Sequence, residues 1–375
     1  MLILAIGMVL VIIAGHIGLS VGSVAAVVGI VVALAIRDWG IPWWLGVILG
    51  LVVGALIGAW QGAWVAYVGI PGFITTLAGM MLFRGANQYI GKSNTIPVPS
   101  QIQYLGAGYL PEWGPNTGLN NSTLLLGVLA IVFTVWVEFR RRSKAAKLNG
   151  AQMPVMVSVI RTVLIVALLG YVTWLFGSGR PGTSFPVSGV ILVVLVIVYH
   201  FISARTITGR HVYAVGGNRA AAALSGVNIK RTNFVVMLNM SLLSALAGIV
   251  FIGRSTASGP FDGTGWELDA IAAVFIGGAA VSGGVGTVVG SMIGGLVMAV
   301  LNNGLQLMGV GSDRTQIIKG LVLLAAVAFD VYNKVQGRPS IIGTLFRNRR
   351  NDIVSPGTSE QPSVPVSAGE TAARG

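Results

Sequence analysis

Long apolar runs recur along nearly the whole of this sequence, and they decide its fold class. Charged residues make up only 9% of the 375 positions, and the mean hydropathy is +0.82. Soluble domains average about 25% charged residues, so this composition points away from a water-soluble fold. A helix of about 20 apolar residues spans a bilayer. The sequence predicts an all-α polytopic membrane protein with about 10–11 apolar segments, at 1–14, 22–36, 43–66, 72–90, 122–138, 154–176, 189–203, 234–252, 268–283, 286–303 and 315–332.

Basic residues set the expected orientation of these segments. The net charge of +13 is concentrated in three regions, at 139–150, 204–232 and beyond 332. Cytoplasmic loops of membrane proteins are enriched in Lys and Arg, which explains this charge better than nucleic-acid binding does. We expect a transmembrane domain over 1–335 and a basic, then disordered, cytoplasmic tail over 336–375. The outer loops are then 91–121, 177–188 and 253–267.

A glycine stripe marks one of the apolar segments. In "GVILGLVVGALIGAWQG" (46–62) glycine occurs at every fourth residue, and a shift of 236 positions aligns this stretch with "SGGVGTVVGSMIGGL" (282–296). Small residues at this spacing let helices in lipid approach closely. The sequence thus predicts an internal repeat with two close-packed helices. The expected helix-packing residues are Gly50, Gly54, Gly58, Gly286, Gly290 and Gly294.

The first apolar run is too short to cross a bilayer comfortably. It is followed by "GHIGLSVGS" (15–23), which is rich in glycine. Either a helix is broken near residues 15–22 or the sequence starts late. Broken helices are typical of transporters, whose substrate route commonly lies near them.

The polar residues inside apolar segments leave two interpretations open. Amides and hydroxyls in hydrocarbon need partners, so they either bond across helices or line a polar path. As substrate-pathway candidates we select Gln61, Thr75, Asn302 and Asn303.

Nothing in the sequence indicates catalysis or a bound metal. There is no cysteine, and His16 has no histidine at metal-ligand spacing. Arg84 is expected to reach the membrane interface or to act on a substrate. Asp262, Glu267 and Asp269 could be an acid–base group, but capping of a helix start is favoured.

The basic region 204–232 contains a candidate docking element. After "GGN", the run "RAAAALSGVNI" predicts a short helix, with Asn218 as N-cap and Gly226 as terminator. Small side chains suit docking into a partner's groove, although an ordinary loop is the alternative. The candidate coupling residues are Gly217, Asn218, Ala221, Ala222, Ser225 and Gly226.

Three motifs in order resemble the permease subunits of monosaccharide ABC importers, the xylose, ribose and galactose group. They are "GHIGLSVGS", "GGNRAAAALSGVNI", and "ELDAIAAVFIGGAAVSGGVGTVVGSMIGGL" followed by "LNNGLQLMGV". The long segment 139–188 is most similar to xylose-type or multiple-sugar permeases. The family motif has Asp before "LSVGS", where this chain has Gly18, and its first helix is not found here.

The resemblance implies a transport subunit of a bacterial inner membrane, not an enzyme. Its partners would be a cytoplasmic ATP-binding subunit, a periplasmic or extracellular sugar-binding protein and a second permease copy. ATP and Mg²⁺ would sit on the ATPase, because "GANQYIGKS" (85–93) has the wrong spacing for a phosphate-binding loop. A permease for another small polar solute and a stand-alone carrier or channel remain the alternatives.

Overall fold

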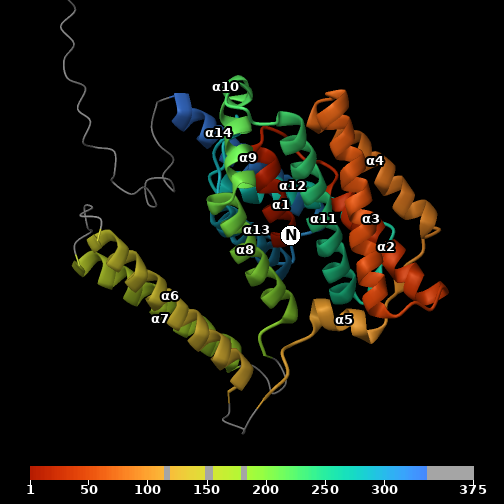
Figure 1. Ribbon diagram of the computed structural model, residues 1–375. Helices are drawn as coiled ribbons and strands as arrows, with labels where there is room; N and C mark the ends of the chain where they lie inside the picture. The colour runs from red at the N-terminus through yellow and green to blue at the C-terminus, as the bar shows by residue number, and fades with distance from the viewer. Residues whose placement is uncertain (114–118, 148–154, 179–183, 336–375) are drawn as a thin grey trace, which may run out of the picture.

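The computed structural model describes residues 1–113, 119–147, 155–178 and 184–335, and these are almost wholly helical (Figure 1). The proposed tail 336–375 lies outside the described residues. The helices are α1 (Leu2–Ile13), α2 (Val21–Asp38), α3 (Trp43–Ala63) with the π-turn η1 (Trp64–Val68), α4 (Gly72–Ile90), α5 (Ser100–Ala107), α6 (Asn121–Lys147), α7 (Val155–Gly177), α8 (Val187–Arg205), α9 (Ile207–Gly217), α10 (Arg219–Leu224), α11 (Ile229–Ser255), α12 (Trp266–Ile276), α13 (Val288–Leu307) and α14 (Ser312–Val335).

Each predicted apolar segment contains a helix, so the all-α membrane class is confirmed. Among the described residues, seven helices are long and apolar enough to cross a bilayer: α2, α3 with η1, α6, α7, α8, α11 and α13. The segment predicted at 268–283 is shorter than expected, because α12 ends at Ile276 and the chain turns before α13. A run of glycines at 277–286 explains this early end, since glycine favours turns over helix.

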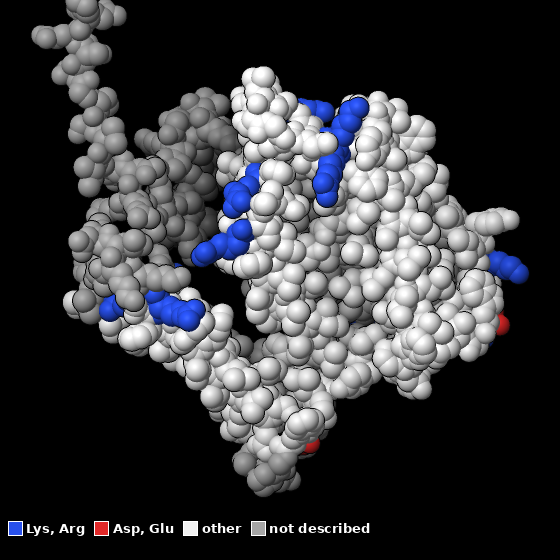
Figure 2. Space-filling view, in the orientation of Figure 1, with Lys and Arg blue, Asp and Glu red and all other residues white. Residues whose placement is uncertain are grey.

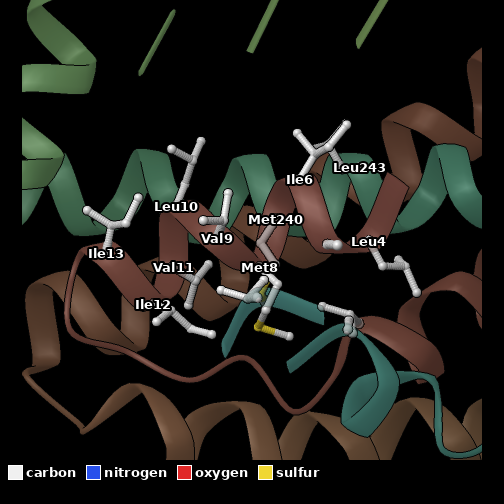
Figure 3. Packing of buried hydrophobic residues seen from close by; sticks show 14 of the residues in the cluster. Leu4, Ile6, Met8, Val9, Leu10, Val11, Ile12, Ile13, Met240 and Leu243 are labelled. Atoms are coloured by element: carbon white, nitrogen blue, oxygen red, sulfur yellow. The ribbon is translucent and has the colours of Figure 1, made fainter. Parts of the chain in front are cut away.

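Helix α1 forms the centre of the bundle. Every residue from Ile3 to Ile13 is buried, and α1 packs against α8, α9, α11, α12 and α13. A helix that is apolar all round is stable only when other helices surround it. Figure 3 shows its Met8 close to Met240 of α11, and both belong to the same buried cluster. The short first apolar run is thus a buried core helix.

The glycine stripe of α3 faces the protein interior. A side chain at Gly50 would meet Val32 of α2, and one at Gly54 would meet Ala245 of α11. The opposite face of α3 exposes large apolar side chains at the same four-residue spacing, at Ile48, Val52, Leu56 and Trp60. Helix α3 therefore presents glycine to its neighbours and bulky apolar groups to lipid.

The second half of the proposed repeat differs in detail from the first. Gly290 and Gly294 lie in α13 and approach the backbone of α12 at Gly277 and Ala273. Gly286 precedes α13 and belongs to the turn after α12, so it is not the helix-packing residue that the alignment predicted. At the level of helices the same packing occurs twice, because α2 contacts α3 and α4 as α12 contacts α13 and α14.

The two ends of the bundle carry different structures. At one end, strands β1 (Ile96–Pro97) and β2 (Ala257–Ser258) pair antiparallel, with Ile96 opposite Ser258, and α5 packs on α11. At the other end lie α9 and α10 (Figure 1). We call these the α5 end and the α10 end. On the face shown in Figure 2, Lys and Arg lie mainly toward the α10 end.

Replacing Gly54 by Leu tests the role of this stripe. A Cβ at Gly54 would lie 2.3 Å from that of Ala245 and 3.2 Å from the carbonyl oxygen of Ser241, so α3 must move away from α11. Overpacking of this kind costs about 1–3 kcal/mol. We expect a lower thermal midpoint in detergent, and transport impaired more than membrane insertion. The control is Gly85→Leu in α4, where no atom lies within 4 Å; equal behaviour of the two variants would contradict the assignment.

Candidate functional site

Between α1 and α2 the chain is not helical, although it lies inside the bundle. Polar side chains of α3 and α4 form hydrogen bonds with this segment. The Leu19 N–H donates to the Thr76 hydroxyl at 3.0 Å, and this hydroxyl lies 3.0 Å from the carbonyl oxygen of Ile17. The break begins at Gly15, with φ of +84°. In a membrane every backbone group away from water needs such a partner, so Thr76 stabilises the interruption.

Gln61, a predicted pathway residue, bonds across three helices. Its amide donates to the Ser20 hydroxyl at 2.7 Å, and the Ser241 hydroxyl of α11 lies 3.5 Å from its carbonyl oxygen. The Gln61 side chain is fully buried. Of the two interpretations of this residue, the structure shows the cross-helix bond.

The other pathway candidates lie apart. Thr75 is buried, and its hydroxyl bonds the carbonyl oxygen of Pro71 in the preceding turn. Asn302 lies near the start of α1, where its amide contacts the Met1 sulfur at 3.8 Å, whereas Asn303 is exposed. The structure therefore does not bring the four candidates into one site.

Arg84 and the acids of α12 form a charged site that the sequence analysis did not predict. Arg84 of α4 pairs with Glu267 at 3.1 Å, and Lys319 of α14 pairs with Asp269 at 3.0 Å. Both acids do lie in the first turn of α12, where a helix N-terminus favours negative charge. Their cationic partners come from distant helices, which sequence spacing could not reveal.

Asp262 has a different role from the other two acids. Its carboxylate accepts the Gly259 N–H at 2.7 Å within the loop before α12. Burial raises the pKa of the Asp262 carboxyl above its usual value, and the hydrogen bond from Gly259 opposes this rise. Asp262 thus organises the loop and takes no part in the ion pairs.

The candidate docking element has the predicted local structure, with one addition. Asn218 caps α10 by accepting the Ala221 N–H at 3.0 Å, and Gly226 adopts φ of +81° after the helix ends. The preceding helix α9 was not predicted. Of the coupling candidates, Ala222 is buried and the other five are exposed. Leu224 is 92% exposed at the end of α10 and was missed by the sequence analysis.

Helix α9 connects this element to both interruptions of the bundle. The Gly284 N–H, in the turn between α12 and α13, donates to the carbonyl oxygen of Ile13 at 2.8 Å. Gly216 of α9 lies so close that a Cβ there would be 1.6 Å from the same oxygen. The Tyr213 hydroxyl donates to the Gly286 carbonyl at 2.7 Å. Movement of α9 would therefore act directly on the ends of α1 and α12.

Comparison with known proteins places this architecture in a family. The model of the family described as branched-chain amino acid transport system / permease component matches residues 1–327. The xylose transport system permease protein of Haemophilus influenzae is 39% identical over 338 residues, 88% of this chain and 86% of the relative. Its Escherichia coli K12 counterpart is 40% identical over 335 residues, 88% of this chain and 82% of the relative.

The ribose import permease protein of Escherichia coli K12 is 35% identical over 337 residues, 89% of this chain and 82% of the relative. No solved structure matches the chain. The chain belongs to this family of transporter permease components, and the predicted similarity to the xylose and ribose group is confirmed. It is a transport subunit and a multi-pass protein of the inner membrane.

At Gly18, where the sequence resemblance leads us to expect Asp, an added side chain would have to displace the end of Met240. A Cβ there would lie 2.2 Å from the Met240 sulfur, and Met240 is itself buried against α1. The end of the Met240 side chain therefore occupies the space beside Gly18.

Introducing Asp at Gly18 should consequently destabilise this protein. Gly18→Asp must displace Met240 and bury a carboxylate, so we expect the thermal midpoint to fall and uptake to decrease. The double variant Gly18→Asp with Met240→Ala should recover part of both, because the sulfur is removed. A single variant as stable as wild type would show that Met240 does not limit this position.

Proposed function

We propose that this chain is the permease subunit of an ATP-driven importer that carries a monosaccharide, xylose or a related pentose or hexose, into the cytoplasm. The observation that carries the proposal is the 39–40% identity to xylose permeases over 88% of the chain. The path from α10 through α9 to both interrupted helices supports it, because an external energy source needs such a connection.

The partners follow from the two ends of the bundle. A cytoplasmic ATPase, which would bind ATP and Mg²⁺, would dock on α10. A sugar-binding protein would deliver its cargo at the α5 end, and two permease copies would pair. This orientation places α10 and the C-terminus in the cytoplasm, in agreement with the basic residues toward the α10 end.

The alternatives make different demands on the charged site. A stand-alone ion-coupled carrier would need buried acids free to bind a cation, whereas Glu267 and Asp269 each already have a basic partner. A permease for another small polar solute would share every feature described so far. Uptake assays separate these cases.

The test is binding-protein-dependent uptake with a panel of labelled pentoses and hexoses. The full chain is reconstituted with a candidate ATPase and a candidate sugar-binding protein. We expect ATP-dependent uptake of at least one sugar, D-xylose first. Uptake of a branched-chain amino acid with no sugar uptake would overturn the proposal, and uptake without the ATPase would favour the stand-alone carrier.

Leu224→Asp tests docking on α10. Leu224 is almost fully exposed and supports no packing within the chain, so the variant should fold normally. We expect ATPase co-purification to fall about tenfold or more, since a central apolar contact contributes about 2 kcal/mol. Gly217→Trp should also reduce ATPase association, because it places a bulky side chain on the proposed docking surface. It should not disturb the fold, because no neighbouring atom lies within 4 Å of a Cβ at Gly217.

The matched control is Tyr89→Asp, which changes an equally exposed side chain near the α5 end. It should leave ATPase association unchanged. Normal association of both α10 variants would remove α10 from the interface. Ala222 is unsuitable for this test because it is buried, and a bulky residue there would disturb the fold itself.

A further inference from the structure

A cavity of about 390 Å³ lies between α4, α12 and α14, and both ion pairs line it. The volume lies within the range of about 300–1,000 Å³ found for small-molecule sites. Beyond the four charged residues, the lining includes Thr264 and Gln316 as polar groups and Leu323 and Met298 as apolar ones. The cavity thus combines apolar walls with a few convergent polar groups.

The acids and bases of the cavity differ in exposure. The side chains of Glu267 and Asp269 are only 7% and 4% exposed, whereas those of Arg84 and Lys319 are 34% and 27% exposed. The carboxylates therefore form the floor of the site and the cations lie at its accessible side. A small molecule reaches the cations first and then competes for the carboxylates.

Buried charges such as those of Glu267 and Asp269 are costly to keep. Ionisable groups within a membrane domain are expensive and mark functional sites more often than structural ones. A buried ion pair also contributes little net stability compared with apolar residues of similar volume. Two pairs converging on one cavity therefore indicate a function beyond holding α12 in place.

The charges of the cavity balance, and this selects the class of ligand. Two carboxylates and two cations add up to zero, so the site offers no net attraction to an ion. It does offer acceptors and donors side by side, which suits adjacent hydroxyl groups that both donate and accept. The short helix α12 also begins here, and transporter substrates commonly bind at the ends of interrupted helices.

We propose that this cavity is a monosaccharide-binding site on the transport path, in which Glu267 and Asp269 accept hydroxyl protons and Arg84 and Lys319 donate to hydroxyl oxygens. The inference rests on the proposed function and adds the residues that contact the sugar. Sugar hydroxyls weaken the ion pairs by competing for their atoms. Because Arg84 belongs to α4 and Lys319 to α14, a bound sugar loosens α12 from both helices.

Protection of an introduced thiol tests occupancy directly. The chain has no cysteine, so Gln316→Cys provides a single thiol on the cavity wall and Met308→Cys a matched one in the exposed turn before α14. Each full-length variant is placed in lipid nanodiscs and its rate of reaction with a small thiol reagent is measured against D-xylose, D-ribose and L-leucine. We expect the sugars to slow Gln316→Cys several-fold and to leave Met308→Cys unchanged.

A rate at Gln316→Cys that no sugar alters overturns the proposal. An equal slowing at both thiols also overturns it, because the sugar would then act on the reagent or on the whole bundle. Slowing by L-leucine in place of the sugars assigns the cavity to a different solute class and contradicts the monosaccharide site.

Charge variants separate sugar contact from structural support. Glu267→Gln should lower the apparent affinity for the transported sugar about tenfold or more, the effect of one charge-assisted hydrogen bond. Glu267→Gln alone leaves Arg84 without its partner and should lower the thermal midpoint. The double variant Arg84→Met with Glu267→Gln removes both charges, so it should have a thermal midpoint closer to that of wild type but should not recover sugar uptake. Asp262→Asn, in the adjoining loop, is the control and should retain uptake.

Recovery of wild-type uptake and KM by the double variant would show that the pair is purely structural. Failure of the proposed function is distinct from this outcome, because the wild-type chain with its partners would then import no sugar. If the wild-type chain imports a sugar that neither protects Gln316→Cys nor depends on Glu267, this inference alone fails.

Discussion

The structure depends on how backbone groups are satisfied where helices stop inside a membrane domain. Two helices, α1 and α12, end within the bundle, and each leaves carbonyl groups without helical partners. The hydrogen bond from Gly284 to the Ile13 carbonyl joins the two endings, and Gly216 of α9 closes over it. Because this contact joins the end of α1 to the turn that follows α12, the positions of α1, that turn and α9 are linked.

A second constraint is that each buried acid of the bundle needs a basic partner. Glu267 and Asp269 are buried at the start of α12, and each has a cation from another helix. A polar solute crossing the membrane must exchange hydration for protein contacts, and few places in so apolar a chain offer them. Helix α12 therefore links the two features: its start carries the paired acids, and the turn that follows its end contacts α9.

The elements that follow from local pattern could be predicted from the sequence. The bounds of α4 agree with its apolar run, and the caps of α10 follow from Asn218 and Gly226. These features depend on residues adjacent in the chain. The stripe at Gly50, Gly54 and Gly58 identified a packing face but not its partners α2 and α11.

What escaped prediction depends on residues far apart. Arg84 and Glu267 are separated by 183 positions, and neither has a local signal of pairing. Gly18 and Met240 became neighbours only through packing of α1 on α11. Gly286 followed the four-residue spacing of a helix, but the glycines around it favour a turn.

The contact at Gly216 limits which amino-acid substitutions the chain can accept. At Gly18 the obstacle is the Met240 side chain, so a smaller residue at position 240 makes room for a larger one at position 18. At Gly216 the obstacle is the Ile13 backbone oxygen, and Gly284 on the other side already lacks a side chain. No second substitution can shrink a main chain. A larger residue at position 18 can therefore be accommodated by a second substitution at position 240. A larger residue at position 216, where α1, α9 and the α12–α13 turn meet, cannot be accommodated in this way.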